Sequence, residues 1–541
     1  MKRSLILLAG ATSVTAAVPV QAQDAAREDS RKVVRVDPYI EASQILAAEI
    51  SPGDDVVTYT QVAAGVDVSV QGRNNGGAAS VRYERTFGYG DSAPDASTIS
   101  GLARGYATVV PQALTVEAGA LATRTRVDGN GGATLTAPGA DASESRIYSI
   151  YAGPNLHTSA GEAEVNAHYR FGYTRAEAPD AIALAPGATP VDVFDESTVN
   201  SANAHVALRP GAPLPVGIGL GGGVYQEDTS NLDSRVRDAH VRADVTVPAG
   251  PSLAFVGGVG YEDVEISNRD ALRDTNGSPV IGSDGRLVTD TSAPRQIAYD
   301  VSGLIWDVGI VWRPSSRTAA EAHVGRRYDS TTYYGSFAWA PDTRSSVNLS
   351  VYDGISGFGG RLTNALASLS TDFVAIRNPV SGDLDGCVTS LEGGNCLTGV
   401  LGSVRSAIFR GRGASLSYSR QIGRLSGGFG AGYDRRKFIG APGTVLASAN
   451  GVIDESYWIA SYVGGQLSAR DSFTVNSRVQ WLKSGFAGAG DATVLSAAAA
   501  YRRYLIEGLS AKAAISLDRL DSDAGRDFSS AAALLGLRYD F

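Results

Sequence analysis

The chain ends in Ala533-Leu534-Leu535-Gly536-Leu537-Arg538-Tyr539-Asp540-Phe541, and this stretch decides the fold. From position 535 on, the odd-numbered positions carry leucine, tyrosine and phenylalanine, while the even-numbered ones carry glycine, arginine and aspartate. Successive side chains of a β-strand point to opposite faces, so one face of this segment is apolar and the other is polar. The stretch therefore predicts a strand that separates two different environments and ends on an aromatic residue.

The same alternation recurs along the chain, for example over Val62–Val70, Val165–Tyr173, Val241–Val247 and Phe473–Trp481. Most such segments run about ten to fourteen residues, enough to cross a bilayer at a tilt, whereas strands of globular proteins average about five or six. This length favours strands that span a membrane over strands of a soluble sandwich.

The links between these segments alternate in length. Gly72–Gly77 and Val110–Ala113 are short, while Asp128–Ser143 and Glu265–Pro294 are long and polar. Short turns on one side and long loops on the other are typical of outer-membrane barrels. We therefore predict an all-β fold, a closed antiparallel transmembrane β-barrel of about 22 strands over residues 36–541, with short periplasmic turns and long extracellular loops, including a long loop at 354–403.

Aromatic residues gather near the ends of the segments, where they suit the girdles at the two membrane interfaces. They are Tyr83, Phe87, Tyr89, Trp306, Trp312, Tyr333, Tyr334, Trp339, Tyr501 and Tyr504.

The amino terminus has the pattern of a secretory signal peptide over residues 1–22. Lys2 and Arg3 precede a short apolar run, Leu5–Ala17, and Val20-Gln21-Ala22 offers a cleavage site. A buried amino-terminal helix is the less favoured alternative. Residues 23–35 would form a short periplasmic amino-terminal segment. The sequence thus predicts export by a signal peptide to the outer membrane of a Gram-negative bacterium, and no later run of about 18 apolar residues offers a helical span.

Composition limits the class of partner and cofactor. The net charge of −9 argues against a nucleic-acid partner, which would favour a basic face. Cys387 and Cys396 lie in one Gly-rich stretch, and in an exported protein a disulfide is favoured over two free thiols. Because no histidine lies nearby, we predict no metal site there and no cofactor.

The polar faces of the segments supply the candidate functional residues. Charged side chains facing lipid at mid-depth cost several kcal/mol, so these residues are expected to face the lumen. They are Arg82, Glu84, His168, Arg170, Arg242, Asp244, Arg478, Gln480, Lys512, Asp518 and Arg538. They either cross-link the interior wall through paired charges or set the selectivity of a pore, and their mixed sign favours the first interpretation.

No motif points to catalysis. Gly90-Asp91-Ser92 resembles the nucleophile block of a secreted esterase class, but no Asp-x-x-His block stands near the five histidines, and a loop tip is the simpler interpretation. Gly217, Gly219 and Gly222 fit a dinucleotide-binding spacing but lie within an alternating strand. We expect no catalytic residues and no enzyme activity.

A barrel of this width commonly has its lumen plugged. The loop from Gly354 to Ser403 is the candidate for such a plug, and its stretch Leu362–Phe373 is expected to form a helix.

Two stretches resemble blocks of a known family: VDPYIEASQILAAEISPGDD at 36–55 and VRSAIFRGRGASLSYSRQ at 404–421. The chain resembles the outer-membrane β-barrel family associated with PEP-CTERM/exosortase and exopolysaccharide loci, which has sphingomonad relatives. Some of these relatives carry the name of the preprotein translocase subunit YajC, a small protein with a single membrane helix that this chain does not fit. The resemblance implies an outer-membrane location and a role in envelope polysaccharide traffic.

These observations lead to a porin-like channel or an export-associated envelope component as the expected function. A structural or surface-adhesive barrel with an occluded lumen is the alternative, and an enzyme ranks lowest. Expected partners are outer-membrane lipid and lipopolysaccharide, envelope polysaccharide and the outer-membrane assembly machinery. A terminal strand ending in Tyr539 and Phe541 resembles the signal that this machinery reads.

Overall fold

The computed structural model describes residues 33–89, 96–127, 133–134, 144–177, 195–211, 214–283, 286–390, 396–401, 404–405, 407–487, 490–523 and 527–541. The expected signal peptide, most of the segment 23–35 and the Gly90-Asp91-Ser92 block lie outside these residues.

The described residues form mostly long strands. Their elements are β1 (Val33–Ser51), β2 (Val56–Gln71), β3 (Asn75–Gly88), β4 (Ser97–Val110), β5 (Leu114–Val127), β6 (Ala133–Thr134), β7 (Glu144–Ala160), β8 (Ala163–Glu177), β9 (Glu196–Leu208), β10 (Gly217–Thr229), η1 (Asn231–Asp233), β11 (Ser234–Pro248), β12 (Leu253–Asn268), β13 (Gln296–Ser315), β14 (Thr318–Arg327), β15 (Ser330–Asp342), β16 (Ser345–Ser356), α1 (Phe358–Ala367), β17 (Val374–Arg377), β18 (Leu384–Thr389), α2 (Thr398–Leu401), β19 (Phe409–Ile422), β20 (Leu425–Phe438), η2 (Val445–Ala449), β21 (Ile453–Gln466), β22 (Asp471–Lys483), β23 (Ala492–Tyr504), β24 (Leu509–Ser522) and β25 (Phe528–Asp540).

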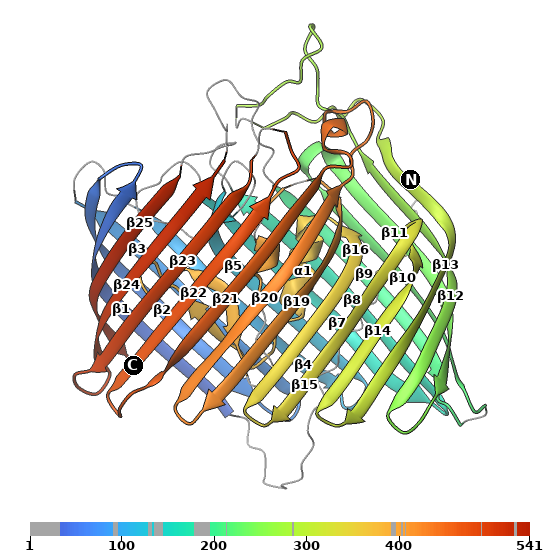
Figure 1. Ribbon diagram of the computed structural model, residues 1–541, viewed down its shortest axis with the longest axis horizontal. Helices are drawn as coiled ribbons and strands as arrows, with labels where there is room; N and C mark the ends of the chain where they lie inside the picture. The colour runs from blue at the N-terminus through green and yellow to red at the C-terminus, as the bar shows by residue number, and fades with distance from the viewer. Residues whose placement is uncertain are drawn as a thin grey trace, which may run out of the picture.

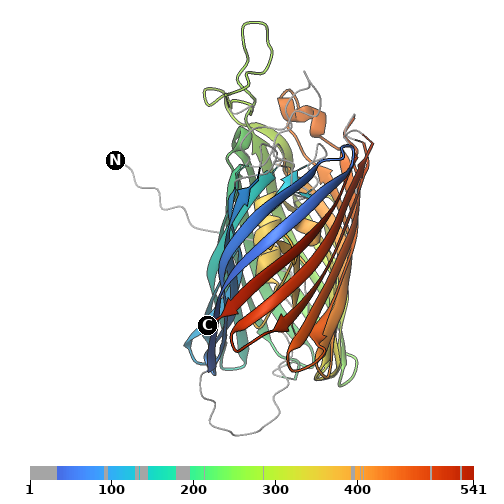
Figure 2. The ribbon, with the colours of Figure 1, turned by 90° about the vertical axis from the view of Figure 1, so that its left-hand side faces the viewer.

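The long strands close into a ring of 22 antiparallel strands, to which β6 is a short addition beside β5. The ring closes where β25 pairs with β1, from Tyr39 opposite Asp540 to Ala48 opposite Ala531. Closure leaves no long exposed edge, which is a requirement for strands that lie in lipid. Figures 1 and 2 show the tilted strands forming one continuous wall. The prediction of a closed antiparallel barrel is confirmed.

Most connections follow the predicted alternation, with short turns at the lower rim of Figure 1 and longer loops at the upper rim. The turn Tyr328–Asp329 is an exception, since it joins β14 to β15 at the upper rim with only two residues between the strands. Both residues have positive φ angles, 54° and 51°. Two-residue hairpin turns with positive φ angles usually contain Asn-Gly. Because Tyr-Asp is not such a pair, the sequence does not indicate this turn.

The outer face of the ring is apolar. Leu304 is 79% exposed and Leu535 is 70% exposed, and many other leucine, valine and isoleucine side chains of the strands are also exposed. A soluble protein rarely exposes a contiguous apolar surface of this extent, whereas a barrel in lipid requires one. No helix among the described residues is both long and apolar enough to cross a membrane.

Nearly all the aromatic residues expected at the interfaces lie on this outer face, including Tyr83, Trp306 and Trp339. Tyr334 is different, and its assignment to a girdle is wrong. Its ring stacks on His323, with 4.7 Å between ring centroids, and its hydroxyl lies 3.5 Å from an Asp307 oxygen. Because Tyr333 and Tyr334 are neighbours in one strand, only one of them can face outward.

Candidate functional site

Residues 357–408 connect β16 to β19 and are called the internal segment below. The residues of this segment that the structure describes occupy the lumen. The described part of the segment contains α1, β17, β18 and α2 and lies inside the ring in both ribbon views (Figures 1 and 2). Because β16 and β19 are neighbours in the wall, the segment enters and leaves the barrel at the same rim. The expected helix does form. It begins at Phe358 and ends at Ala367, so its start lies about one helical turn before the predicted start at Leu362.

Helix α1 packs against the inner wall through one apolar face. Phe358, Leu362 and Leu366 recur at helical spacing and are buried in one cluster with Leu121 of β5 and Ile147 of β7. Burial of such side chains contributes about 1.5–3 kcal/mol each. The wall therefore has an apolar patch on its inner face that matches the helix.

The start of α1 is fixed by a buried carboxylate from β10. Glu227 accepts hydrogen bonds from the backbone N–H groups of Gly357 (2.6 Å) and Gly360 (3.0 Å), which would otherwise be unpaired at the helix start. A Cβ atom at Gly360 would lie 1.8 Å from the Tyr225 hydroxyl. Only glycine permits this close approach of the helix to the wall.

A buried network of charges lies on the wall beside the segment. Arg82 pairs with Glu41 at 3.1 Å and with Glu84 at 3.2 Å, and Lys512 pairs with the second oxygen of Glu41 at 2.9 Å. The Arg82 side chain is only 4% exposed. Buried charges of this kind persist only when they are paired and hydrogen-bonded.

The same network reaches the internal segment through Arg124 of β5. Its guanidinium lies 3.0 Å from Glu84 and 2.6 Å from Asp383 of the segment. The cations Arg82, Lys512 and Arg124 thus meet the anions Glu41, Glu84 and Asp383. Equal numbers of each sign are typical of a cross-linked interior and not of a ring of one sign.

Arg377 of β17 forms a second bond between the segment and the wall. Its guanidinium donates to the Ser100 hydroxyl at 2.7 Å and to the Ser80 carbonyl and hydroxyl, each at 3.1 Å. It also donates to the Gly382 carbonyl at 3.0 Å, which holds the segment's own turn. A planar guanidinium with several fixed donors suits this role better than a lysine would.

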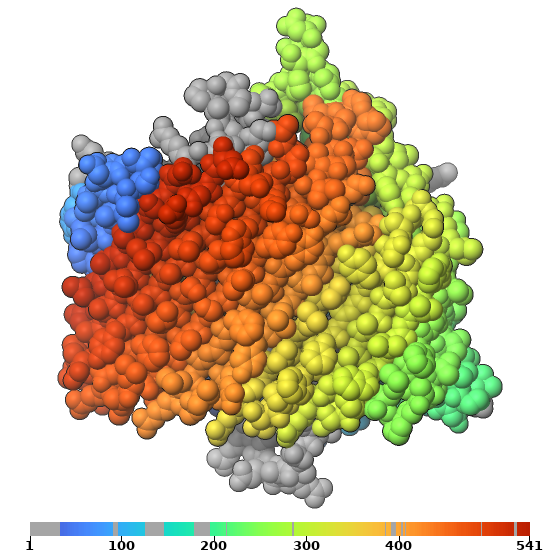
Figure 3. Space-filling model, viewed as in Figure 1, coloured from blue at the N-terminus to red at the C-terminus, as the bar shows by residue number. Residues whose placement is uncertain are grey.

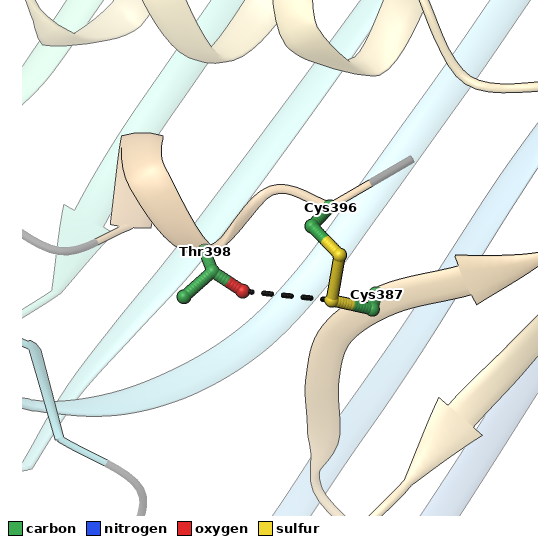
Figure 4. The surroundings of a disulfide bond; sticks show 3 residues. All are labelled: Cys387, Cys396 and Thr398. Carbon is green, nitrogen blue, oxygen red and sulfur yellow. Dashed lines mark hydrogen bonds between the residues drawn. A yellow bond between two sulfur atoms is a disulfide. The ribbon is translucent and has the colours of Figure 1, made fainter. Parts of the chain in front are cut away.

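Cys387 and Cys396 form a disulfide within the internal segment (Figure 4). The sulfur of Cys387 lies 3.7 Å from the Thr398 hydroxyl. Beside the disulfide is a small cavity whose lining includes Tyr418, Phe429 and the predicted residue Arg478. The disulfide joins two parts of the segment to each other and not to the wall.

Arg242 and Asp244 belong to a separate network on β9–β14. Arg242 pairs with Asp307 at 2.7 Å and with Asp244 at 2.9 Å. His205 lies 2.9 Å from Asp244, and His323 lies 2.9 Å from Asp307. Arg242 thus pairs with two carboxylates, and each of these carboxylates also meets a histidine.

The other predicted residues have different neighbours. Arg170 bonds to Glu117 of the wall and to Asn364 of α1, and His168 lies beside Asn203. Gln480 donates to Ser456, Asp518 lies opposite Ser496 and Ser530 in the strand register, and Arg538 pairs with Asp540 while lying over the Tyr39 ring. The structure therefore divides the predicted set among several clusters, of which only some touch the internal segment.

At the carboxyl end, Tyr539 and Phe541 point to the outer face. Phe541 is 74% exposed, and its ring meets that of Tyr539 edge to face with 5.0 Å between centroids. The Phe541 N–H donates to the Pro38 carbonyl at 3.1 Å, which continues the closure between the first and last strands.

Sequence reasoning missed Glu41, Arg377 and Asp383. Glu41 could have been found, because it alternates with the apolar residues Ile40 and Ala42 in the first predicted strand. Arg377 and Asp383 lie in a stretch without periodicity, and no local pattern indicates their partners. Among the described residues there is no cluster of three or more His, Cys, Asp or Glu that could hold a metal ion.

No family model and no curated protein matches the chain. Solved structures of similar shape include the FrpB iron transporter from Neisseria meningitidis in its apoprotein form, with 10% identity and a TM-score of 0.44 over 94% of this chain and 81% of that chain. The ferric-catecholate import receptor Fiu from E. coli K12 has 9% identity and a TM-score of 0.44 over 93% of this chain and 81% of that one. At identities and TM-scores this low, neither likeness carries an argument about function.

Proposed function

We propose that this protein is an outer-membrane channel of a Gram-negative bacterium, closed at rest by its internal segment. The observation that carries the proposal is that the segment lies in the lumen and bonds to the wall through polar side chains. Arg377 holds it to β3 and β4, and Asp383 holds it to β5. Polar contacts between a chain segment and an inner wall can be replaced by water when the segment moves.

The anchoring of the segment supports movement as one body. Its two ends join neighbouring strands, so it stays attached to one rim, and its disulfide cross-links the segment internally while it packs against Trp458 of β21. The alternative of a structural barrel with an occluded lumen shares the same geometry at rest, so the two must be separated by experiment.

Single-channel conductance in planar bilayers separates the two functions. We expect the wild-type protein to show rare openings and Arg377→Gln to open several times more often. A variant with residues 358–401 replaced by a short Gly-Ser linker should conduct continuously. Arg519→Gln is the matched control, because Arg519 lies on the outer face and pairs with Asp521. If only the linker variant conducts, the segment is a permanent filling and the structural alternative holds.

The finer expectation, traffic of envelope polysaccharide, rests on the resemblance of residues 36–55 and 404–421. It is tested by adding polysaccharide fragments to the open linker variant. Reversible current blocks by acidic fragments, but not by neutral dextran of equal size, support it, and identical responses to both count against it.

A further inference from the structure

The outer face of β19–β22 carries an excess of positive charge at the long-loop end. The start of β19 contains Arg410 and Arg412, and the end of β20 contains Arg435 and Lys437. The last residue of β22 is Lys483. These five residues are called the basic strip below. It stands out in a chain whose net charge is −9.

The strand register places the strip on one face. Arg410 is directly opposite Lys437, and Arg412 is directly opposite Arg435. Directly opposed residues of antiparallel strands point to the same side, with about 4.5–5.5 Å between their Cβ atoms. Arg412 lies over the ring of Tyr333 and Lys483 over the ring of Tyr457, and both rings belong to the exposed outer surface. Arg410 lies over the buried ring of Tyr328, and its side chain is only 13% exposed.

An aromatic and apolar surface begins directly below the strip on the same strands. Tyr457 and Trp481 are opposed in the register and exposed, and Phe429, Ile459 and Val475 follow further from the rim. Figure 3 shows the orange and red strands of this part as a continuous outer wall. Since aromatic girdles mark the membrane interface, the strip lies at the depth of the lipid headgroups on the long-loop side.

The carboxylates near the strip do not balance it. Asp353 accepts from both Arg410 and Arg412, at 2.7 and 3.1 Å. Glu455 lies 3.9 Å from Arg435 and accepts a hydrogen bond from the Tyr433 hydroxyl at 2.7 Å. Glu455 is also directly opposed to Lys483 in the register, and the Asp491 carboxylate accepts a hydrogen bond from the Ser484 N–H, next to Lys483, at 3.3 Å. Three carboxylates therefore face five cations.

Lys437 is exposed, and neither it nor Lys483 has a carboxylate within salt-bridge distance in the part of the chain that the structure describes. The Lys437 ammonium and the Lys483 ammonium, which lies over the Tyr457 ring, thus form no salt bridge within the described residues.

Elsewhere on the outer face near the same rim, Arg85 lies over the Phe87 ring, while several other charges are matched. Arg326 pairs with Asp329, Arg519 with Asp521, and Arg175 with Glu177. On β12 and β13 the outward charges Glu265 and Asp300, which are opposed in the register, are acidic. Five basic residues gathered on neighbouring strands at one part of the rim are a feature of a binding surface and not of general solvation.

We propose that the basic strip binds the phosphate groups of an outer-leaflet glycolipid of the lipid A type. Its acyl chains would lie along the apolar wall of β19–β22, and its phosphates would contact Arg435, Lys437 and Lys483. Arginine and lysine are the usual partners of phosphate, and the adjacent apolar wall selects a lipid over a soluble anion.

Native mass spectrometry of the full chain in a mild detergent tests the proposal with three lipid probes. They are bisphosphorylated lipid A, the same lipid after enzymatic removal of its phosphates, and phosphatidylcholine. We expect one or more bisphosphorylated molecules to be retained, at an affinity at least tenfold above that for the dephosphorylated form. Retention of the two forms of lipid A to the same extent overturns the proposal.

Variants locate the binding surface. The triple variant Arg435→Gln, Lys437→Gln and Lys483→Gln should lose about tenfold in affinity for bisphosphorylated lipid A. The matched control replaces Arg326, Arg519 and Arg175 by glutamine, which removes the same charge from the same rim, and it should bind like the wild type. Heat-dependent mobility on gels verifies that both variants are folded. Equal losses in both variants would show a general charge effect and overturn the assignment to the strip.

Discussion

Glu41 is the residue on which the buried network beside the internal segment depends most. Its two oxygens pair with Arg82 and Lys512, and the carboxylate is almost fully buried. Glu41→Gln would leave the Lys512 ammonium without its partner, while Arg82 would retain Glu84. Because a broken buried pair leaves an uncompensated charge, we expect a loss of roughly 3–5 kcal/mol in the free energy of unfolding. Urea titration in lipid vesicles, followed by the gel mobility of the folded barrel, measures this loss.

The double variant Glu41→Gln and Lys512→Met provides the control at the same residues. It removes both charges of one pair, so it should recover a large part of the lost stability. A double variant no more stable than Glu41→Gln alone would contradict the role assigned to this pair.

At the scale of elements, the loop after β12 rests on the loop after β20 through Asp270. Its carboxylate accepts from the Val445 N–H at 2.8 Å and from the Arg273 guanidinium at 2.9 Å. Partial burial raises the pKa of Asp270, but these hydrogen bonds outweigh burial, and the pKa lies below its usual value. Because the folded pKa is lowered, docking is stabilised above about pH 4, and this stabilisation is lost as the pH falls through the lowered value.

A nitroxide label at Ala447→Cys reports this docking, since Ala447 is exposed beside Val445 and the native cysteines are joined in a disulfide. The label should become more mobile as the pH falls from 5 toward 2, as measured by electron paramagnetic resonance at about 25 °C. In Asp270→Asn the amide oxygen can still accept from Val445, so the mobility should not depend on pH. Equal pH dependence in both proteins would assign the effect to another group.

The elements also show how far the sequence predicts the structure. Period-two alternation predicts the strands and their two faces because each face meets a uniform environment. It does not predict which charges pair, because the partners lie far apart in the chain: Arg124 and Asp383 are separated by 259 residues. The turn at Tyr328–Asp329 was missed for another reason, since its positive φ angles fall on residues that carry no turn signal.

The whole molecule is closed by its last strand, and the terminal residue adds little to that closure. Phe541 makes one backbone hydrogen bond to Pro38 and one ring contact with Tyr539, and most of its side chain is exposed. Its removal should therefore cost the finished barrel about 1 kcal/mol or less, the net contribution of one hydrogen bond. If the terminal aromatic residue is read during assembly, its removal should have a much larger effect in cells than in vitro.

Deletion of Phe541 is therefore expected to lower the amount of folded protein in the outer membrane several-fold while leaving refolding from urea into detergent micelles unchanged. Both are measured from the fraction of the chain that shows the heat-dependent gel shift. Deletion of the exposed Leu505 in a lower-rim turn is the control, because it removes one apolar residue away from the terminus. Normal assembly of the shortened chain in cells would contradict recognition of Phe541. Impaired refolding in micelles would instead show that the residue acts through closure of the ring, because no assembly factor is present there.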